Sequence, residues 1–193
     1  MYYPIYPEAN IGQQQVTLVI GLFEKAQDVE DVLQALEKDG YGEDDIAVAM
    51  SDETRGKSFF IEKHSRAGSG AAGLGVVGGI TGAIIAGIMG TGTVATGGLN
   101  LVVAGPILSA LAGFGAGSIA GGFFGALIGA GIPEYDVEFF RHGMKEGNVL
   151  IAVKTDGPEQ ADIVKELFEK HNVVVKDEES QVETPQEGEQ NAV

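Results

Sequence analysis

Two parts of the chain, one near each end, carry hydrophobic patterns typical of strands and amphipathic helices. In the N-terminal part, QVTLVIGLF (15–23) is rich in β-branched residues and predicts a strand. AQDVEDVLQALEKDG (26–40) predicts a helix that ends at Gly40. DIAVAM (45–50) predicts a second strand, and SFFIEKH (58–64) a short strand or a lead-in to the following segment. The apolar face of the predicted helix consists of Val29, Val32, Leu33 and Leu36.

The C-terminal part has a similar pattern. PEYDVEFFRHGMKEG (133–147) predicts a short connecting helix, and NVLIAVKT (148–155) a strand. PEQADIVKELFEKH (158–171) predicts a helix, and NVVVKD (172–177) a final strand. The apolar face of the second helix consists of Ala161, Val164, Leu167 and Phe168.

The two parts repeat each other at a constant offset of 132 residues, without gaps. Each part is a βαβ unit that is too small to bury its own sheet face. Two such units side by side predict an α+β fold, with a ferredoxin-like four-stranded sheet covered by helices. The matched positions are Leu18 with Leu150, Val19 with Ile151, Val32 with Val164, and Leu36 with Phe168.

The segment between the two parts has no charged residue and no histidine from Ala67 to Pro133. Its two apolar runs, at about 69–90 and 106–131, flank a Thr-, Gly- and Asn-containing turn region. As a helix, the first run is about 33 Å long, against a bilayer core of about 30 Å. The segment therefore predicts a transmembrane helical hairpin at 67–133. The alternatives are a buried hairpin inside a soluble oligomer and a flexible low-complexity segment.

Small residues recur at every fourth position in both runs, which keeps them on one face of a helix. Such rows let another helix approach closely, as in membrane helix packing. The pattern predicts glycine zippers that pack the two helices together and join copies of the chain into a homo-oligomer. The candidate helix-packing residues are Gly75, Gly79, Ala83, Gly87, Gly105, Ser109, Gly113, Gly117, Gly121, Gly125 and Gly129.

The remaining domain boundaries follow from these assignments. Residues 15–66 form the first half of the ferredoxin-like domain, and residues 134–176 form the connecting helix and the second half. Residues 1–14 are expected to be a flexible segment, and residues 177–193 a disordered acidic tail.

Basic residues flank the predicted hairpin on both sides, whereas its 91–105 loop has none. Because the two halves must meet, an even number of spans is required. The positive-inside rule then predicts a two-span protein of the inner (cytoplasmic) membrane, with both termini cytoplasmic and membrane lipid as a partner. The flanking basic residues are Arg55, Lys57, Lys63, Arg66, Arg141 and Lys145.

Composition excludes several functional classes. The formal net charge is −16 and the isoelectric point is near 4.4, which argues against nucleic acid as a partner. The chain has no cysteine, so disulfides and thiolate metal sites are excluded. Its N-terminus lacks the pattern of a cleaved signal peptide.

Candidate chemistry is sparse. Gly68–Gly73 matches GxGxxG, but no acidic residue follows about 20 positions later, and a glycine-rich membrane entry is the better interpretation. The histidines His64, His142 and His171 do not have metal-ligand spacing. The simplest interpretation of two groups of acidic residues is that they belong to the solvated surface. We therefore expect no enzymatic activity, no cofactor and no metal. The acidic groups are Glu43, Asp44 and Asp45, and Asp28, Glu30 and Asp31.

Several segments resemble a family of bacterial general-stress membrane proteins, one branch of which is called low-temperature-induced protein. The most specific are AGPILSALAG (104–113) and GIPEYDVEFF (131–140), and the resemblance covers about residues 15–176. The family pairs a heat-induced general-stress-type domain with a glycine-zipper hairpin. The resemblance implies a membrane location and stress-linked expression, and it supplies no catalytic residues.

These observations favour a stress-associated integral membrane protein that is not an enzyme. It would anchor a small cytoplasmic α+β domain and self-associate through its glycine rows. One alternative is an oligomeric channel or small-solute conduit. Another is a ligand-sensing regulatory module, because two βαβ halves can hold a small molecule in their cleft. The sequence does not identify a protein partner.

Overall fold

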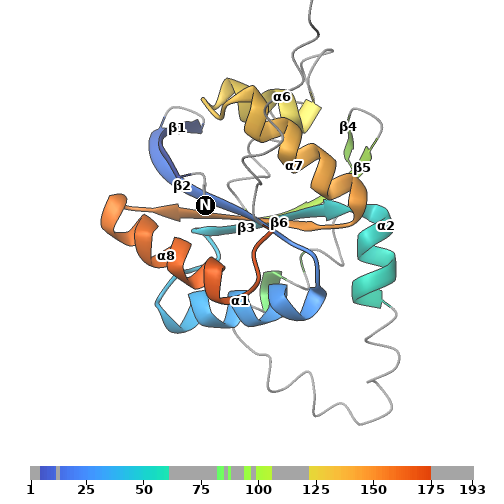
Figure 1. Ribbon diagram of the computed structural model, residues 1–193, viewed down its shortest axis with the longest axis horizontal. Helices are drawn as coiled ribbons and strands as arrows, with labels where there is room; N and C mark the ends of the chain where they lie inside the picture. The colour runs from blue at the N-terminus through green and yellow to red at the C-terminus, as the bar shows by residue number, and fades with distance from the viewer. Residues whose placement is uncertain are drawn as a thin grey trace, which may run out of the picture.

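The computed structural model describes residues 5–11, 14–60, 82–84, 87, 94–96, 99–105 and 122–174. Its centre is one antiparallel sheet of six strands in the order β1-β2-β6-β3-β5-β4, with helices on both faces (Figure 1). The predicted α+β class is therefore confirmed. The strands are β1 (Ile5–Ile11), β2 (Gln14–Phe23), β3 (Ile46–Ser51), β4 (Val94–Thr96), β5 (Leu99–Ala104) and β6 (Val149–Thr155). The helices are α1 (Ala26–Lys38), α2 (Asp52–Thr54) with the π-helical segment Arg55–Phe60, α6 (Gly122–Gly129), α7 (Glu134–Glu146) and α8 (Pro158–Lys170).

The two repeated parts of the sequence meet at the centre of the sheet. β2, α1 and β3 follow one another along the chain, yet β6 lies between β2 and β3 and pairs antiparallel with both. After α8, Val173 forms an antiparallel bridge with Phe23, on the side of β2 that faces away from β6. The predicted strands 15–23, 45–50 and 148–155 are confirmed by β2, β3 and β6.

Repeat-related residues occupy equivalent places in the core. Leu18 and Leu150 are buried in the same cluster on one face of the sheet. Val19 and Ile151, their neighbours along the two strands, belong to the cluster on the other face. This agreement follows from strand geometry, because successive side chains point to opposite faces.

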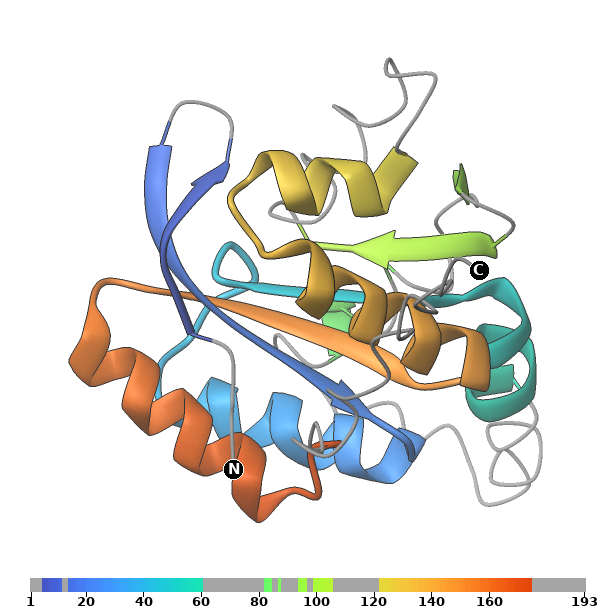
Figure 2. The ribbon, with the colours of Figure 1, turned by 45° about the horizontal axis from the view of Figure 1, so that its top comes forward.

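Helices α1 and α8 cover one face of the sheet (Figures 1 and 2). Both helices turn their predicted apolar positions inward, because residues three and four apart lie on the same side of a helix. The Phe23 and Phe168 rings meet edge to face with 5.2 Å between centroids, which joins β2 to α8. The buried side chains of the two helices are Val29, Val32, Leu33 and Leu36, and Ala161, Val164, Leu167 and Phe168.

Helices α6 and α7 cover the opposite face (Figures 1 and 2). The guanidinium carbon of Arg141 on α7 lies 4.9 Å from the centre of the Phe124 ring on α6, so the two helices also contact each other. Three residues of β3 and β6 on this face are alanines (Ala47, Ala49 and Ala152), which leaves room for the large side chains of the helices. The buried cluster includes Phe123, Phe124, Leu127, Val137, Phe140 and Met144 with Leu18, Ile20, Leu22, Ala47, Ala49, Leu150 and Ala152.

The helices end in similar left-handed turns. After α1, the N–H groups of Gly40 and Tyr41 donate to the carbonyl oxygens of Glu37 and Leu36, which is the Schellman arrangement. Gly40 has φ 92°, a region where a side chain is strained, so the predicted helix end at Gly40 is confirmed. Residues with positive φ also follow α6, α7 and α8, namely Gly131, Gly147 and Asn172.

The predicted two-span protein of the inner membrane, with both termini cytoplasmic, is wrong. Among the helices that the structure describes, none is long and apolar enough to cross a membrane. The central region instead contributes to the domain: β5 pairs with β3, and α6 packs on the sheet. Most of the predicted spans 69–90 and 106–131 lies outside the described residues.

The structure differs from the sequence predictions at three smaller places. Residues 5–11, expected to be flexible, form edge strand β1 and pair with β2. The Arg55–Phe60 segment is helical where a strand or lead-in was expected from residue 58. Of the predicted strand 172–177, the described part contains only the bridge at Val173. The acidic tail 177–193 lies outside the described residues.

Candidate functional site

The candidate helix-packing residues are only partly covered by the structure. Gly125 and Gly129 on α6 face open space, because a Cβ built on either would meet nothing within 4 Å. A Cβ on Gly87 would lie 3.6 Å from the Ala104 Cβ, an ordinary contact. Ala83 is exposed. Gly75, Gly79, Ser109, Gly113, Gly117 and Gly121 lie outside the described residues, and the packing role of the set stays a prediction.

Gly105 has a local structural role. It follows β5 with φ 94°, and a Cβ there would lie 2.4 Å from the carbonyl oxygen of Ile46. A close approach of two backbones requires glycine at this position. Gly105 therefore ends β5 beside β3. This role does not depend on its position in the row of small residues.

Among the described residues, the candidate histidines and the acidic residue Asp28 are not grouped into one site. His142 lies on α7 and His171 at the end of α8, which cover opposite faces of the sheet, and His64 and Gly68–Gly73 lie outside the described residues. The Asp28 carboxylate accepts a hydrogen bond from the Asn172 side chain at 3.2 Å. Within the described ranges, no three His, Cys, Asp or Glu side chains are grouped so as to hold a metal ion.

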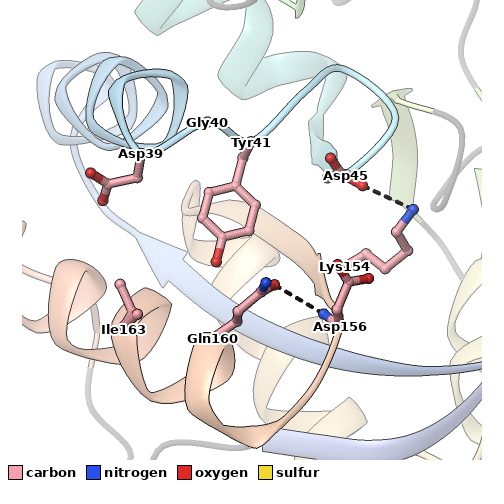
Figure 3. A pocket seen from close by; sticks show the side chains of 8 residues that line it. All are labelled: Asp39, Gly40, Tyr41, Asp45, Lys154, Asp156, Gln160 and Ile163. Atoms are coloured by element: carbon pink, nitrogen blue, oxygen red, sulfur yellow. Dashed lines mark hydrogen bonds and ion pairs between the residues drawn. The ribbon is translucent and has the colours of Figure 1, made fainter.

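A pocket of about 460 Å³ opens between the two repeated halves at one end of the sheet. The first half supplies the loop from α1 to β3, and the second half supplies the end of β6 and the first turns of α8. Figure 3 shows the Tyr41 ring projecting toward Gln160, with Asp45 and Lys154 to one side. The lining residues are Asp39, Gly40, Tyr41, Asp45, Lys154, Asp156, Gln160 and Ile163.

Backbone geometry explains why these residues meet. The left-handed turn at Gly40 reverses the chain after α1 and directs Tyr41 away from the helix. On the other side, Gln160 in the first turn of α8 accepts a hydrogen bond from the Asp156 N–H through its Oε1, at 3.1 Å. Because Ile46 is opposite Val153, the start of β3 lies beside the end of β6, and the two loops border one cleft.

Asp45 and Lys154 join the two halves at the edge of the pocket. The Lys154 N–H donates to the Asp45 carbonyl oxygen at 2.8 Å, and the Lys154 Nζ lies 2.9 Å from the Asp45 Oδ1. The Gly42 N–H donates to the Asp45 Oδ2 at 3.1 Å. Burial raises the pKa of Asp45, but hydrogen bonds from Lys154 and Gly42 lower it, and the balance leaves this pKa below 3.8. The hydrogen bond with Asp45 raises the pKa of Lys154.

The pocket has an excess of negative charge. Asp39, Asp45 and Asp156 stand against one ammonium group, that of Lys154, which Asp45 already engages. Burial raises the pKa of the Tyr41 phenol, and the charges of Asp39, Asp45 and Asp156 raise it further. The charges of three carboxylates, drawn from both halves, therefore act on the Tyr41 hydroxyl.

The lining residues are suited to binding. They comprise carboxylates, an ammonium group, an amide, a phenol and the aliphatic side chain of Ile163, which is 53% exposed. In small-molecule sites, convergent polar groups of this kind fix the orientation of the ligand. No histidine, serine or threonine is among these lining residues.

Sequence reasoning singled out Asp45 but did not find Tyr41, Lys154, Asp156 or Gln160. The available signal was the offset repeat. Combined with antiparallel pairing of the strands, it brings the loop after α1 beside the loop before α8. Comparison of the chain with protein-family models, curated proteins and solved structures finds no match. The resemblance to general-stress proteins, with the stress-linked expression that it implies, therefore stays a prediction.

Proposed function

We propose that this chain is a non-enzymatic regulatory module that binds a small molecule in the cleft between its two halves. The observation that carries the proposal is the shared lining of the pocket. Tyr41 and Asp45 come from the first half, and Lys154 and Gln160 from the second. A ligand that touches both halves would stabilise their association. A sensing module requires such a difference in stability between its ligand-bound and ligand-free forms.

The proposal includes a ferredoxin-like arrangement of the core. Support comes from the order in which Val173, β2, β6 and β3 lie across the sheet. In this order, two βαβ units each enclose a strand of the other unit. The outer strands β1, β4 and β5 would then be additions to a core made of the repeated halves.

A thermal-unfolding screen tests the proposed function. The full-length chain is melted with cationic, anionic and neutral small molecules, and unfolding is followed by circular dichroism. A ligand present at 100 times its Kd stabilises a protein by about 2.7 kcal/mol, which raises the Tm by about 5–10 °C for a chain of this size.

The pocket variant is Tyr41→Ala, and the matched control is Tyr135→Ala on α7, at the opposite face of the sheet. We expect Tyr41→Ala to lose the ligand-induced rise in Tm and Tyr135→Ala to keep it. A panel without any stabilising compound, or a shift that persists in Tyr41→Ala, would contradict the proposal.

A second proposal concerns self-association through α6. Its support is the open space at Gly125 and Gly129, together with the neighbouring Ile128, which is 41% exposed. Small residues beside an exposed apolar side chain permit close helix contact. We expect Gly125→Leu to lower the oligomer fraction in sedimentation velocity, with Gly157→Leu, also in open space but outside α6, as the control. An unchanged mass distribution in Gly125→Leu argues against this role.

A further inference from the structure

We propose that the ligand of the pocket is an organic cation, with a primary ammonium group carried on a short hydrocarbon chain. This inference rests on the proposed binding function and specifies the chemistry of the ligand. It draws on two separate features of the same cleft, namely two carboxylates that form no ion pair within the described part of the chain and the exposed apolar surface that borders the cleft.

The first feature is uncompensated charge. Lys154 is held by Asp45 at 2.9 Å. Within the described part of the chain, no ion pair joins the carboxylate of Asp39 or of Asp156 to a basic side chain. An ammonium group bound in the cleft would be attracted by both carboxylates, which line it.

The second feature is apolar surface that the protein itself leaves uncovered. Ile163 is one of only three large hydrophobic residues that are exposed in the described part of the chain, and it borders the cleft. The Tyr41 ring projects from the opposite side, on the other half of the domain (Figure 3). A hydrocarbon chain would be sheltered by Ile163, while the Tyr41 ring face adds attraction for the cation.

Other ligand classes fit less well. An anion would face three carboxylates, and the one ammonium group among the lining residues is already engaged by Asp45. Calcium and magnesium require several oxygen ligands around one point, and no such grouping exists among the described residues. Neither of these classes accounts for the exposed side chain of Ile163.

Isothermal titration of the full-length chain with three probes of equal chain length tests the inference. The probes are n-hexylammonium chloride, sodium hexanoate and hexan-1-ol, with calcium chloride as the inorganic cation. We expect binding of hexylammonium, and weaker or no binding of the other three. Higher sodium chloride concentrations should weaken binding of hexylammonium, because exposed charges are screened by salt.

The charge variant is Asp39→Asn/Asp156→Asn, and the matched control is Asp162→Asn, which removes an exposed charge from α8 outside the pocket lining. We expect the double variant to bind hexylammonium about tenfold more weakly and the control to bind it like the wild type. Ile163→Ser should also weaken hexylammonium binding, and it changes no charge.

The outcomes separate the inference from the proposed function. Equal binding of hexanoate or calcium, or full affinity in both Asp39→Asn/Asp156→Asn and Ile163→Ser, would overturn the inference. If a neutral or anionic compound binds and its affinity falls in Tyr41→Ala, the proposed function stands and the cationic ligand is rejected. If no compound of any charge binds, both fail.

Discussion

The Tyr6 hydroxyl donates a hydrogen bond to the Asp136 Oδ2 at 3.0 Å, across 130 residues of sequence. Both side chains are buried, with 6% and 3% of their surface exposed. The contact fastens the N-terminal strand β1 to the first turn of α7. Residues 5–11, which the sequence predicts to be flexible, are thereby attached to the core.

Tyr6→Phe should destabilise the protein by about 1–3 kcal/mol, because a buried carboxylate loses a hydrogen-bond donor. Urea unfolding followed by circular dichroism measures the change. Tyr135→Phe, at a residue that is 46% exposed, is the control and should have a smaller effect. Equal stability of Tyr6→Phe and the wild type would show that the hydrogen bond does not hold β1 in place.

Two helical glycines should respond to alanine in opposite directions. A Cβ on Gly143 in α7 would lie 2.5 Å from the Leu22 Cδ1, whereas a Cβ on Gly125 in α6 would meet nothing within 4 Å. Gly143→Ala should destabilise the domain by about 1–3 kcal/mol through overpacking. Gly125→Ala should stabilise it by up to about 1 kcal/mol through helix propensity. Thermal melts compare the two, and a stabilising Gly143→Ala would contradict the packing of α7 on β2.

Acid should remove the contribution of the Asp45–Lys154 pair. The pKa of Asp45 is lower in the folded state than its ordinary value of 3.8. The stabilisation is therefore present above pH 3.8 and is lost as the pH falls through the folded-state pKa. Asp45→Asn should be less stable than the wild type by about 1 kcal/mol at pH 6, and the difference should shrink below about pH 4.

Asp44→Asn is the control for this comparison, because Asp44 is an exposed neighbour that does not form the ion pair. Urea unfolding at pH 3, 4 and 6 gives the stability of each protein. A difference between Asp45→Asn and the wild type that stays constant from pH 6 to pH 3 would contradict the role of the ionised carboxylate.

The Tyr41 phenol should ionise at a pH above its ordinary value of 10.0, because burial and three carboxylates raise its pKa. Subtracting the ultraviolet titration of Tyr41→Phe from that of the wild type isolates this group. In Asp39→Asn/Asp156→Asn the Tyr41 pKa should fall toward 10. A Tyr41 pKa at or below 10 in the wild type would contradict the electrostatic description of the cleft.

The repeated halves could be predicted from the sequence because local patterns specify them. The apolar positions of α1 and α8 have helical spacing, and Gly40 marks a helix end. The offset repeat correctly matched Leu18 with Leu150. The helical spacing and the helix end depend on neighbouring residues only, and the repeat is found by comparing the sequence with itself, so neither requires knowledge of contacts in the fold.

The central region was misread because the absence of charge has two physical explanations. A chain segment avoids charge when it lies in lipid, and also when it covers a sheet face. Phe123, Phe124 and Leu127 are buried against the second face of the sheet. The signal that was available is the uninterrupted apolar run of residues 46–50 in β3. All residues of β3 are buried, which is typical of a strand covered on both faces.

The pocket depends on pairing between distant strands, which explains why sequence reasoning found only one of its residues. Asp45 and Lys154 are brought together by the register of β3 and β6. The turn at Gly40 is a local feature that directs Tyr41 away from α1. Whether Tyr41 then borders a cleft depends on the position of α8. Residue types alone gave no reason to connect these positions.

Nuclear magnetic resonance gives the most direct test of ligand binding between the halves. The ¹⁵N-labelled full-length chain is titrated with n-hexylammonium chloride, and amide chemical shifts are followed. A ligand bound in the cleft should cause saturable changes in residues 39–45 and 154–163 together, with little change in α6 and α7. Absence of any saturable change, or changes confined to one half or to α6 and α7, would contradict binding between the halves.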